Sequence, residues 1–229
     1  MNRPSSTFPP LPPSPPDPPF PRHTPWLPEP RPTAPGPVSA SAWLVVGDGD
    51  RLAERLLDQR VVLLAGELDD DAVNRAVAAL ALLDASGDDP VELRLSGVSA
   101  DLDATLPIVD ALDLMGAPVH ATALGRISGP AVALLAVADH RVAGAHAVLH
   151  LCEPRSPHGI PAPEVEAWAA ERTRRLRALQ ERLAAACSRP VDEIAADMRA
   201  GRLLSAQEAT DYGLVDATEA AGRTPRSTR

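Results

Sequence analysis

The sequence predicts an α/β domain built on a mostly parallel sheet and followed by a long helix. Three segments typical of strands lie at residues 60–66, 91–95 and 119–124, of which the first is a short apolar run and the second alternates apolar and charged residues, and a helical pattern follows each of them. Because parallel strands need a crossover of helix length, this order favours a parallel sheet with right-handed connections. Aromatic residues make up only 3% of the chain, so the core must consist of Ala, Val, Leu and Ile.

The individual elements follow from local patterns. The stretch 69–85 places Val73, Val77 and Leu80 on one helical face, which is typical of an amphipathic helix packed on a sheet. Ser205 and Glu208 have the spacing of a capping box, which indicates the start of a short helix. The remaining expected elements are helices at 51–57, 102–115, 130–138, 163–186 and 191–199, short strands at 141–143 and 147–150, and a closing turn and strand at 213–216.

Residues 1–40 differ in composition from the rest of the chain. Proline recurs through residues 9–21, and because proline lacks a backbone donor and fixes φ, this segment cannot form helices or sheet ladders. We expect it to be disordered or polyproline II in character. An unstructured extension is favoured over a ligand for a proline-recognising domain. The globular domain is expected at residues 41–218, with a disordered tail at 219–229.

Composition narrows the classes of partner. The formal net charge of −9 argues against nucleic-acid binding, which needs a basic face. A run of arginines at 172–177 could bind an anion, but a solvated helix face is favoured. No apolar run approaches the roughly 18 residues that span a membrane, and the N-terminus lacks the apolar core of a signal peptide. Cys152 and Cys187 have no metal-ligand spacing, so we expect a reducing, cytoplasmic location.

Three segments carry a resemblance to a known family. The run from Gly201 to Asp216, the strand and turn at 60–71, and the long helix followed by the turn at 188–194 resemble the proteolytic subunits of Clp proteases over residues 50–218. The resemblance implies a stacked ββα superhelix with a mostly parallel sheet and a long handle helix, the fold shared with crotonases. It also implies ATP-dependent serine endopeptidase activity and assembly into stacked seven-membered rings.

The resemblance implies a Ser-His-Asp triad, and all three positions are substituted here. In the family, a Gly-x-Ala-x-Ser-x-Gly-Ala stretch puts the serine at a helix start; aligning it with residues 125–136 puts Gly129 at the nucleophile. Keeping a proline in register puts Cys152 at the histidine, with a two-residue deletion near 143–146. Counting back from the closing motif puts Gly201 at the aspartate.

The oxyanion region departs from the family as well. The family has Asn-Ser-Pro-Gly-Gly-Ser after its second strand, whereas Ser99 and Ala100 replace the glycine pair here, and Pro130 is the third equivalent position in this region. Glycine permits backbone conformations that these residues disfavour. The sequence therefore favours a catalytically inactive relative that acts as a structural or regulatory subunit.

Two catalytic alternatives stay open, so whether the chain is an enzyme is undecided. A displaced endopeptidase site would use Ser128 and His150, with Asp197 or Asp139 orienting the histidine. Capping of the helix after Ser128 is the favoured interpretation of that serine. The second alternative is a crotonase-like acyl-thioester enzyme, because residues 139–143 resemble the crotonase Asp-x-Arg-Val-Ala run.

No cofactor or metal is expected. His120, His140 and His146 show no ligand spacing with acidic residues, and a lone cysteine such as Cys152 behaves as a small hydrophobic residue by default. The expected partners are further copies of the chain or active Clp proteolytic paralogues in a ring, and an AAA+ unfoldase reached through that assembly. Neither a nucleic acid nor a membrane is expected as a partner.

Overall fold

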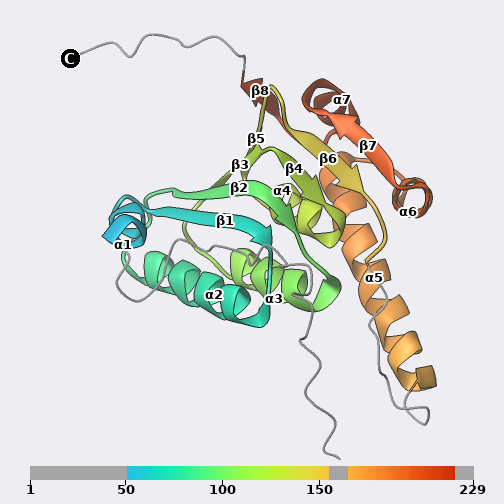
Figure 1. Ribbon diagram of the computed structural model, residues 1–229, viewed down its shortest axis with the longest axis horizontal. Coiled ribbons are helices and arrows are strands. Elements are labelled where there is room, and N and C mark those ends of the chain that lie inside the picture. The colour runs from blue at the N-terminus through green and yellow to red at the C-terminus, as the bar shows by residue number, and fades with distance from the viewer. Residues whose placement is uncertain (1–50, 155–164, 220–229) are drawn as a thin grey trace, which may run out of the picture. The chain divides into compact units, whose positions relative to one another are not determined.

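The computed structural model describes residues 51–154 and 165–219 (Figure 1). The predictions made for the proline-rich segment 1–40 and for the chain beyond residue 219 lie outside these residues. No helix in the described ranges is long and apolar enough to span a membrane.

The described strands form one sheet in which every pairing except β6–β7 is parallel. Their order is β7-β6-β4-β2-β3-β5-β8, and β1 pairs with β2 outside this path. The mixed α/β architecture with its mostly parallel sheet confirms the predicted fold class. The strands are β1 (Val61–Glu67), β2 (Val91–Ser99), β3 (Val119–Leu124), β4 (Arg126–Ser128), β5 (His140–Gly144), β6 (Val148–Leu151), β7 (Arg202–Ser205) and β8 (Ala217–Glu219).

One face of the sheet packs on helices. In β2, Leu93 and Leu95 are fully buried, whereas Arg94 between them is exposed, because successive side chains point to opposite faces. Figure 1 shows α2 and α3 along the same side of the strands. The helices are α1 (Arg51–Asp58), α2 (Asp70–Ala85), α3 (Leu102–Asp113), the 3-10 turn η1 (Gly129–Ala131), α4 (Val132–Ala136), α5 (Val165–Cys187), α6 (Val191–Ala200) and α7 (Ala206–Tyr212).

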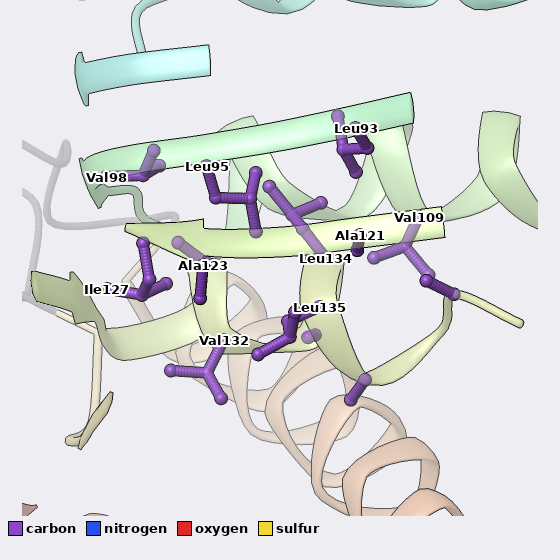
Figure 2. Close-up of a cluster of buried hydrophobic side chains, with 14 of the residues drawn as sticks. Leu93, Leu95, Val98, Val109, Ala121, Ala123, Ile127, Val132, Leu134 and Leu135 are labelled. Carbon is purple, nitrogen blue, oxygen red and sulfur yellow. The ribbon is translucent and has the colours of Figure 1, made fainter. Parts of the chain in front are cut away.

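The core between sheet and helices is aliphatic (Figure 2). Leu134 and Leu135 of α4 are completely buried and lie close to Leu95 and Ala123, which come from β2 and β3. The small side chain of Ala123 allows α4 to approach the sheet closely. This packing holds the start of α4 at a fixed place relative to the ends of the strands.

Several boundaries differ from the sequence-based expectations. Strand β2 extends to Ser99, and β4 and β7 were not predicted as strands. The helix expected at 130–138 begins as a 3-10 turn and its α-helical part ends at Ala136. Strands of three or four residues are too short to show a period, and they are defined by their pairing with β2 and β6.

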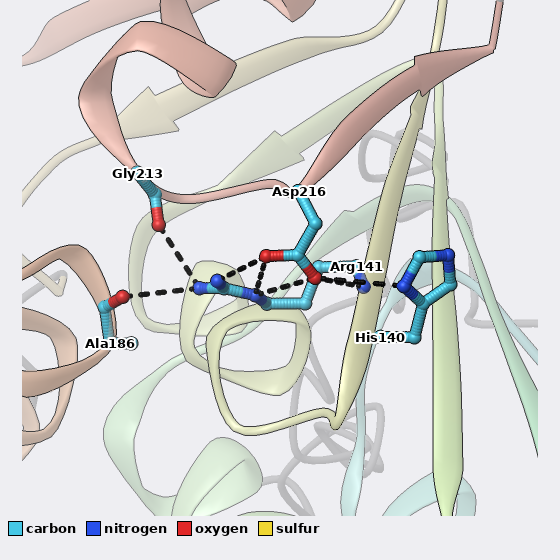
Figure 3. A network of polar contacts seen from close by, with 5 residues as sticks. All are labelled: His140, Arg141, Ala186, Gly213 and Asp216. Carbon is cyan, nitrogen blue, oxygen red and sulfur yellow. Dashed lines mark hydrogen bonds and ion pairs between the residues drawn. The ribbon is translucent and has the colours of Figure 1, made fainter.

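A polar network joins the closing segment to the sheet (Figure 3). Arg141 of β5 donates to Asp216 Oδ1 at 2.5 Å and to the carbonyl oxygens of Gly213 and Ala186 at 3.0 and 3.3 Å. Asp216 also accepts from the backbone N–H of Arg141 at 2.8 Å. The network thereby joins the end of α5 and the turn after α7 to β5. Asp216, the last residue of the closing motif, has a structural role as the partner of Arg141 in this network.

The Asp216 carboxylate makes this network sensitive to pH. Burial alone would raise its pKa, but the hydrogen bonds and charge of Arg141 outweigh burial and lower the pKa below its ordinary value of 3.8. A lowered pKa in the folded state contributes stability above the unfolded pKa that is lost as pH falls through the folded pKa. We therefore expect the difference in unfolding free energy between the wild type and Asp216→Asn to be constant at neutral pH and to shrink below about pH 4. Urea titrations between pH 7 and pH 2.5 measure it, and a difference that grew on acidification would contradict the assignment.

Candidate functional site

A small cavity lies where several parallel strands end. Strands β2, β4 and β6 end at Ser99, Ser128 and Leu151, and the carboxyl ends of parallel strands meet at one edge of a sheet. Ligands of open α/β sheets bind at this edge. The cavity has a volume of about 120 Å³ and is lined by Glu67, Ser99, Ala100, Asp101, Ser128, Gly129, Pro130, Cys152, Glu153 and Pro154.

Gly129 occupies a sharp turn between β4 and the helical segment that follows. Its φ of 65° lies in the left-handed region, which favours glycine. A Cβ at this position would lie 3.6 Å from both the Cys152 Sγ and the Ala100 carbonyl oxygen, at ordinary van der Waals distance. A strand-to-helix turn of this kind presents the nucleophile in some hydrolases. In this chain the residue at the turn is glycine, which has a hydrogen atom in place of a nucleophilic side chain.

The other two positions aligned with the triad lie close by. Strand β6 runs antiparallel to β7, with Leu151 opposite Arg202, so Cys152 follows β6 alongside the residue that precedes β7, Gly201. Gly201 ends α6 with a φ of 69°, and a Cβ there would lie 3.6 Å from Nε2 of His150. The fold thus brings together Gly129, Cys152 and Gly201, which are far apart in sequence.

Comparison with known proteins decides the family. The family model described as Clp protease matches residues 48–220. The chain belongs to the Clp protease family. It is 36% identical over 172 residues to the ATP-dependent Clp protease proteolytic subunit 3 of Rhodococcus jostii (strain RHA1), covering 73% of this chain and 84% of that subunit. It is 27% identical over 184 residues to the proteolytic subunit 2 of Nocardia farcinica (strain IFM 10152), covering 78% and 90%.

The turn after β2 has ordinary backbone conformations at the two positions that the sequence aligns with the family's glycine pair. Among the described residues other than glycine, only Arg60 and Ser188 have positive φ, so Ser99 and Ala100 adopt ordinary backbone conformations. The Asp101 side chain accepts the N–H of Ala104 at 2.9 Å and caps α3. The loop in this Clp family member is therefore a capped strand-to-helix turn beside the cavity.

Pro130 has a direct chemical consequence. It is buried and lies in η1, directly after Gly129. In hydrolases with a strand-to-helix nucleophile turn, the backbone N–H of the residue after the nucleophile stabilises the oxyanion. Proline has no backbone N–H, so position 130 cannot donate a hydrogen bond into the cavity.

Ser128 and His150, the residues of the displaced-site hypothesis, are neighbours across the sheet. Ser128 of β4 pairs with His150 of β6 and with Ser99 of β2, so the three residues form one row. Residues paired in this way point to the same face. No hydrogen bond joins the Ser128 hydroxyl to His150 within the described residues.

The predicted capping role of Ser128 is only half correct. Ser128 stands at the N-cap position of η1, but its hydroxyl makes no capping hydrogen bond. A side-chain cap needs the following residues in helical conformation so that their N–H groups converge on it. Gly129 turns the backbone to positive φ, which removes that geometry.

Asp197 and Asp139, the proposed orienting carboxylates, already have other partners. Asp197 Oδ2 accepts from the Tyr212 hydroxyl at 2.6 Å and from Arg202 at 3.0 Å. Burial raises the pKa of Tyr212 well above its ordinary value of 10.0, and the hydrogen bond to Asp197 is the second cause of the increase. Asp139 accepts the backbone N–H of Val119 at 2.8 Å. Both carboxylates therefore serve the packing of the fold, a role that sequence reasoning missed because it depends on which helices and strands lie side by side.

The arginine run on α5 is compensated by acids. Arg174 and Arg177 form ion pairs with Glu171 and Asp192, and Arg175 forms one with Asp103. These pairs reduce the positive charge available to an anion. Within 51–154 and 165–219, no group of three or more His, Cys, Asp or Glu side chains is placed to hold a metal ion.

Proposed function

We propose that this chain is a catalytically inactive Clp proteolytic subunit that acts as a structural or regulatory member of a cytoplasmic Clp-type ring. The observation that carries the proposal is the Gly129–Pro130 pair at the turn beside the cavity. One residue lacks a nucleophile and the next lacks the backbone N–H that would stabilise an oxyanion. Both substitutions affect the same chemical step, the attack of a nucleophile on the carbonyl carbon of the peptide bond.

The chemistry of the neighbouring positions supports the proposal. Acyl transfer by a serine hydrolase needs a hydroxyl, a base within about 3 Å of it and a carboxylate that orients the base. Gly129, Cys152 and Gly201 supply neither the hydroxyl nor the carboxylate. Restoring one of them would not restore the reaction, because the triad acts as a unit.

The long helix α5 supports a role in assembly. Of its 23 residues, the first fourteen or so are exposed or half-buried, and the buried ones begin at Leu179. A solvated helix segment of this length is marginal in water unless another surface packs on it. A ring of this chain alone or with active Clp paralogues would provide that surface, and an AAA+ unfoldase would be reached through the ring.

Co-assembly tests this role. The full-length chain is mixed with an active Clp proteolytic subunit from the same cell, and native mass spectrometry identifies the species formed. We expect mixed rings, or rings of this chain alone, and we expect Ala169→Glu on the exposed face of α5 to weaken them. Trp168→Phe, on the half-buried face of the same turn, is the matched control. A chain that stays monomeric or dimeric under all conditions would contradict the proposal.

A second candidate function is an active endopeptidase that uses Ser128 and His150. The cross-strand pairing of these residues favours it. Against it stand the missing hydrogen bond between them and the engagement of Asp197 by Tyr212 and Arg202. An active site of this kind would lose peptide hydrolysis in both Ser128→Ala and His150→Ala.

A further inference from the structure

We propose that His120 and His140 together bind one transition-metal ion of the Zn²⁺ or Ni²⁺ class on the sheet face opposite the helices. The two residues belong to the adjacent parallel strands β3 and β5 and are direct partners in the register. Paired residues of neighbouring strands point to the same side of the sheet. Their rings lie 5.6 Å apart between centroids, with planes at 73° to each other.

The ring separation fits a shared ion. Imidazole nitrogen binds zinc at about 2.0–2.1 Å, so two imidazoles on one tetrahedral ion have ring centres about 5 Å apart. The observed separation therefore needs only side-chain rotation to direct one nitrogen of each ring to a common point. Imidazole is a preferred ligand of zinc, nickel and copper and a poor one for magnesium or calcium.

The Asp216 carboxylate lies next to the His140 ring. His140 Nδ1 lies 3.8 Å from Asp216 Oδ2, and Arg141 holds that carboxylate in place (Figure 3). A hydrogen bond from one imidazole nitrogen to a carboxylate orients the ring and leaves the other nitrogen for the metal, and the 3.8 Å separation here must shorten by side-chain rotation for that bond to form. Metal-binding histidines commonly have a partner of this kind, so the fixed carboxylate supports His140 as a ligand.

The surroundings leave room for the remaining ligands. The His140 side chain is 53% exposed, so water can complete the coordination. Glu92 is the register partner of His120 on β2, but its carboxylate pairs with Arg94 at 2.9 Å. The site thus offers two protein ligands, and its affinity for Ni²⁺ and Zn²⁺ rests on chelation by both rings.

Calorimetric titration tests the proposal on the full-length chain without an affinity tag. We expect saturable binding of one Zn²⁺ or Ni²⁺ per chain at neutral pH, and its loss in both His120→Ala and His140→Ala. His146→Ala and His150→Ala are matched controls that remove a histidine elsewhere and should bind as the wild type does. An absence of binding in the wild type, or binding retained in either His120→Ala or His140→Ala, would overturn the proposal.

A measurement on the wild type avoids any effect of substitution on folding. Paramagnetic Ni²⁺, added below stoichiometry, should selectively broaden the ring proton signals of His120 and His140 in a proton NMR spectrum. The same substitutions assign those signals. Broadening of other histidine signals with these two unaffected would place the ion elsewhere and overturn the proposal.

Discussion

Replacing Gly213 with alanine should lower the free energy of unfolding by about 3 kcal/mol. Gly213 has a φ of 90° at the end of α7, where a side chain is strained. A Cβ there would also lie 2.9 Å from the carbonyl oxygen of Cys187 and 3.2 Å from its Cα. These are backbone atoms at the end of α5, so no side-chain rotation relieves the overlap, and the two helices would have to separate.

Gly97→Ala is the matched control for this substitution. Gly97 has a φ of 62°, but nothing lies within 4 Å of a Cβ built on it. Gly97→Ala should lower the free energy of unfolding by only about 1 kcal/mol, which is the conformational cost of alanine at positive φ. Chemical denaturation followed by circular dichroism measures both variants. If both variants lost the same free energy of unfolding, the overlap with Cys187 would contribute nothing to the effect of Gly213→Ala.

Replacing Arg141 with methionine should lower the free energy of unfolding by about 2–3 kcal/mol. The Arg141 side chain is only 16% exposed and donates to Asp216 and to two backbone carbonyl oxygens. Methionine retains most of the apolar stem but leaves those carbonyl oxygens and the carboxylate without their donor.

Arg94→Met provides the comparison for Arg141→Met. Arg94 pairs with Glu92 at 2.9 Å, but its side chain is 48% exposed. Exposed pairs contribute little, so the change in unfolding free energy should stay within about 0.5 kcal/mol. If Arg94→Met lowered the free energy of unfolding as much as Arg141→Met, burial would not explain the stabilising effect of the Arg141 network.

The sequence predicted the elements whose signals are local. Strand β3 was expected at the observed residues, 119–124. The capping box of Ser205 and Glu208 is present with both of its hydrogen bonds. Strands β4 and β7 were missed because they are defined by partners rather than by their own sequence.

The candidate site was harder to predict than the fold. Its residues could be named only through the resemblance to the Clp family, and the structure adds their proximity: Gly129 lies beside Cys152, and Gly201 beside His150. The engagement of Asp197 by Tyr212 could not be foreseen from spacing, because the partners come from different helices. The pairing of His120 with His140 depends likewise on strand register, which the sequence does not reveal.

Labelling with a fluorophosphonate probe tests the central claim most directly. The purified full-length chain is treated with the probe beside an active Clp proteolytic subunit, which reports that the reaction works. We predict no labelling of the wild type or of Ser128→Ala, because Gly129 offers no hydroxyl and Pro130 no oxyanion donor. Labelling of the wild type that disappears in Ser128→Ala would contradict this account and would identify a serine hydrolase with its nucleophile one residue earlier.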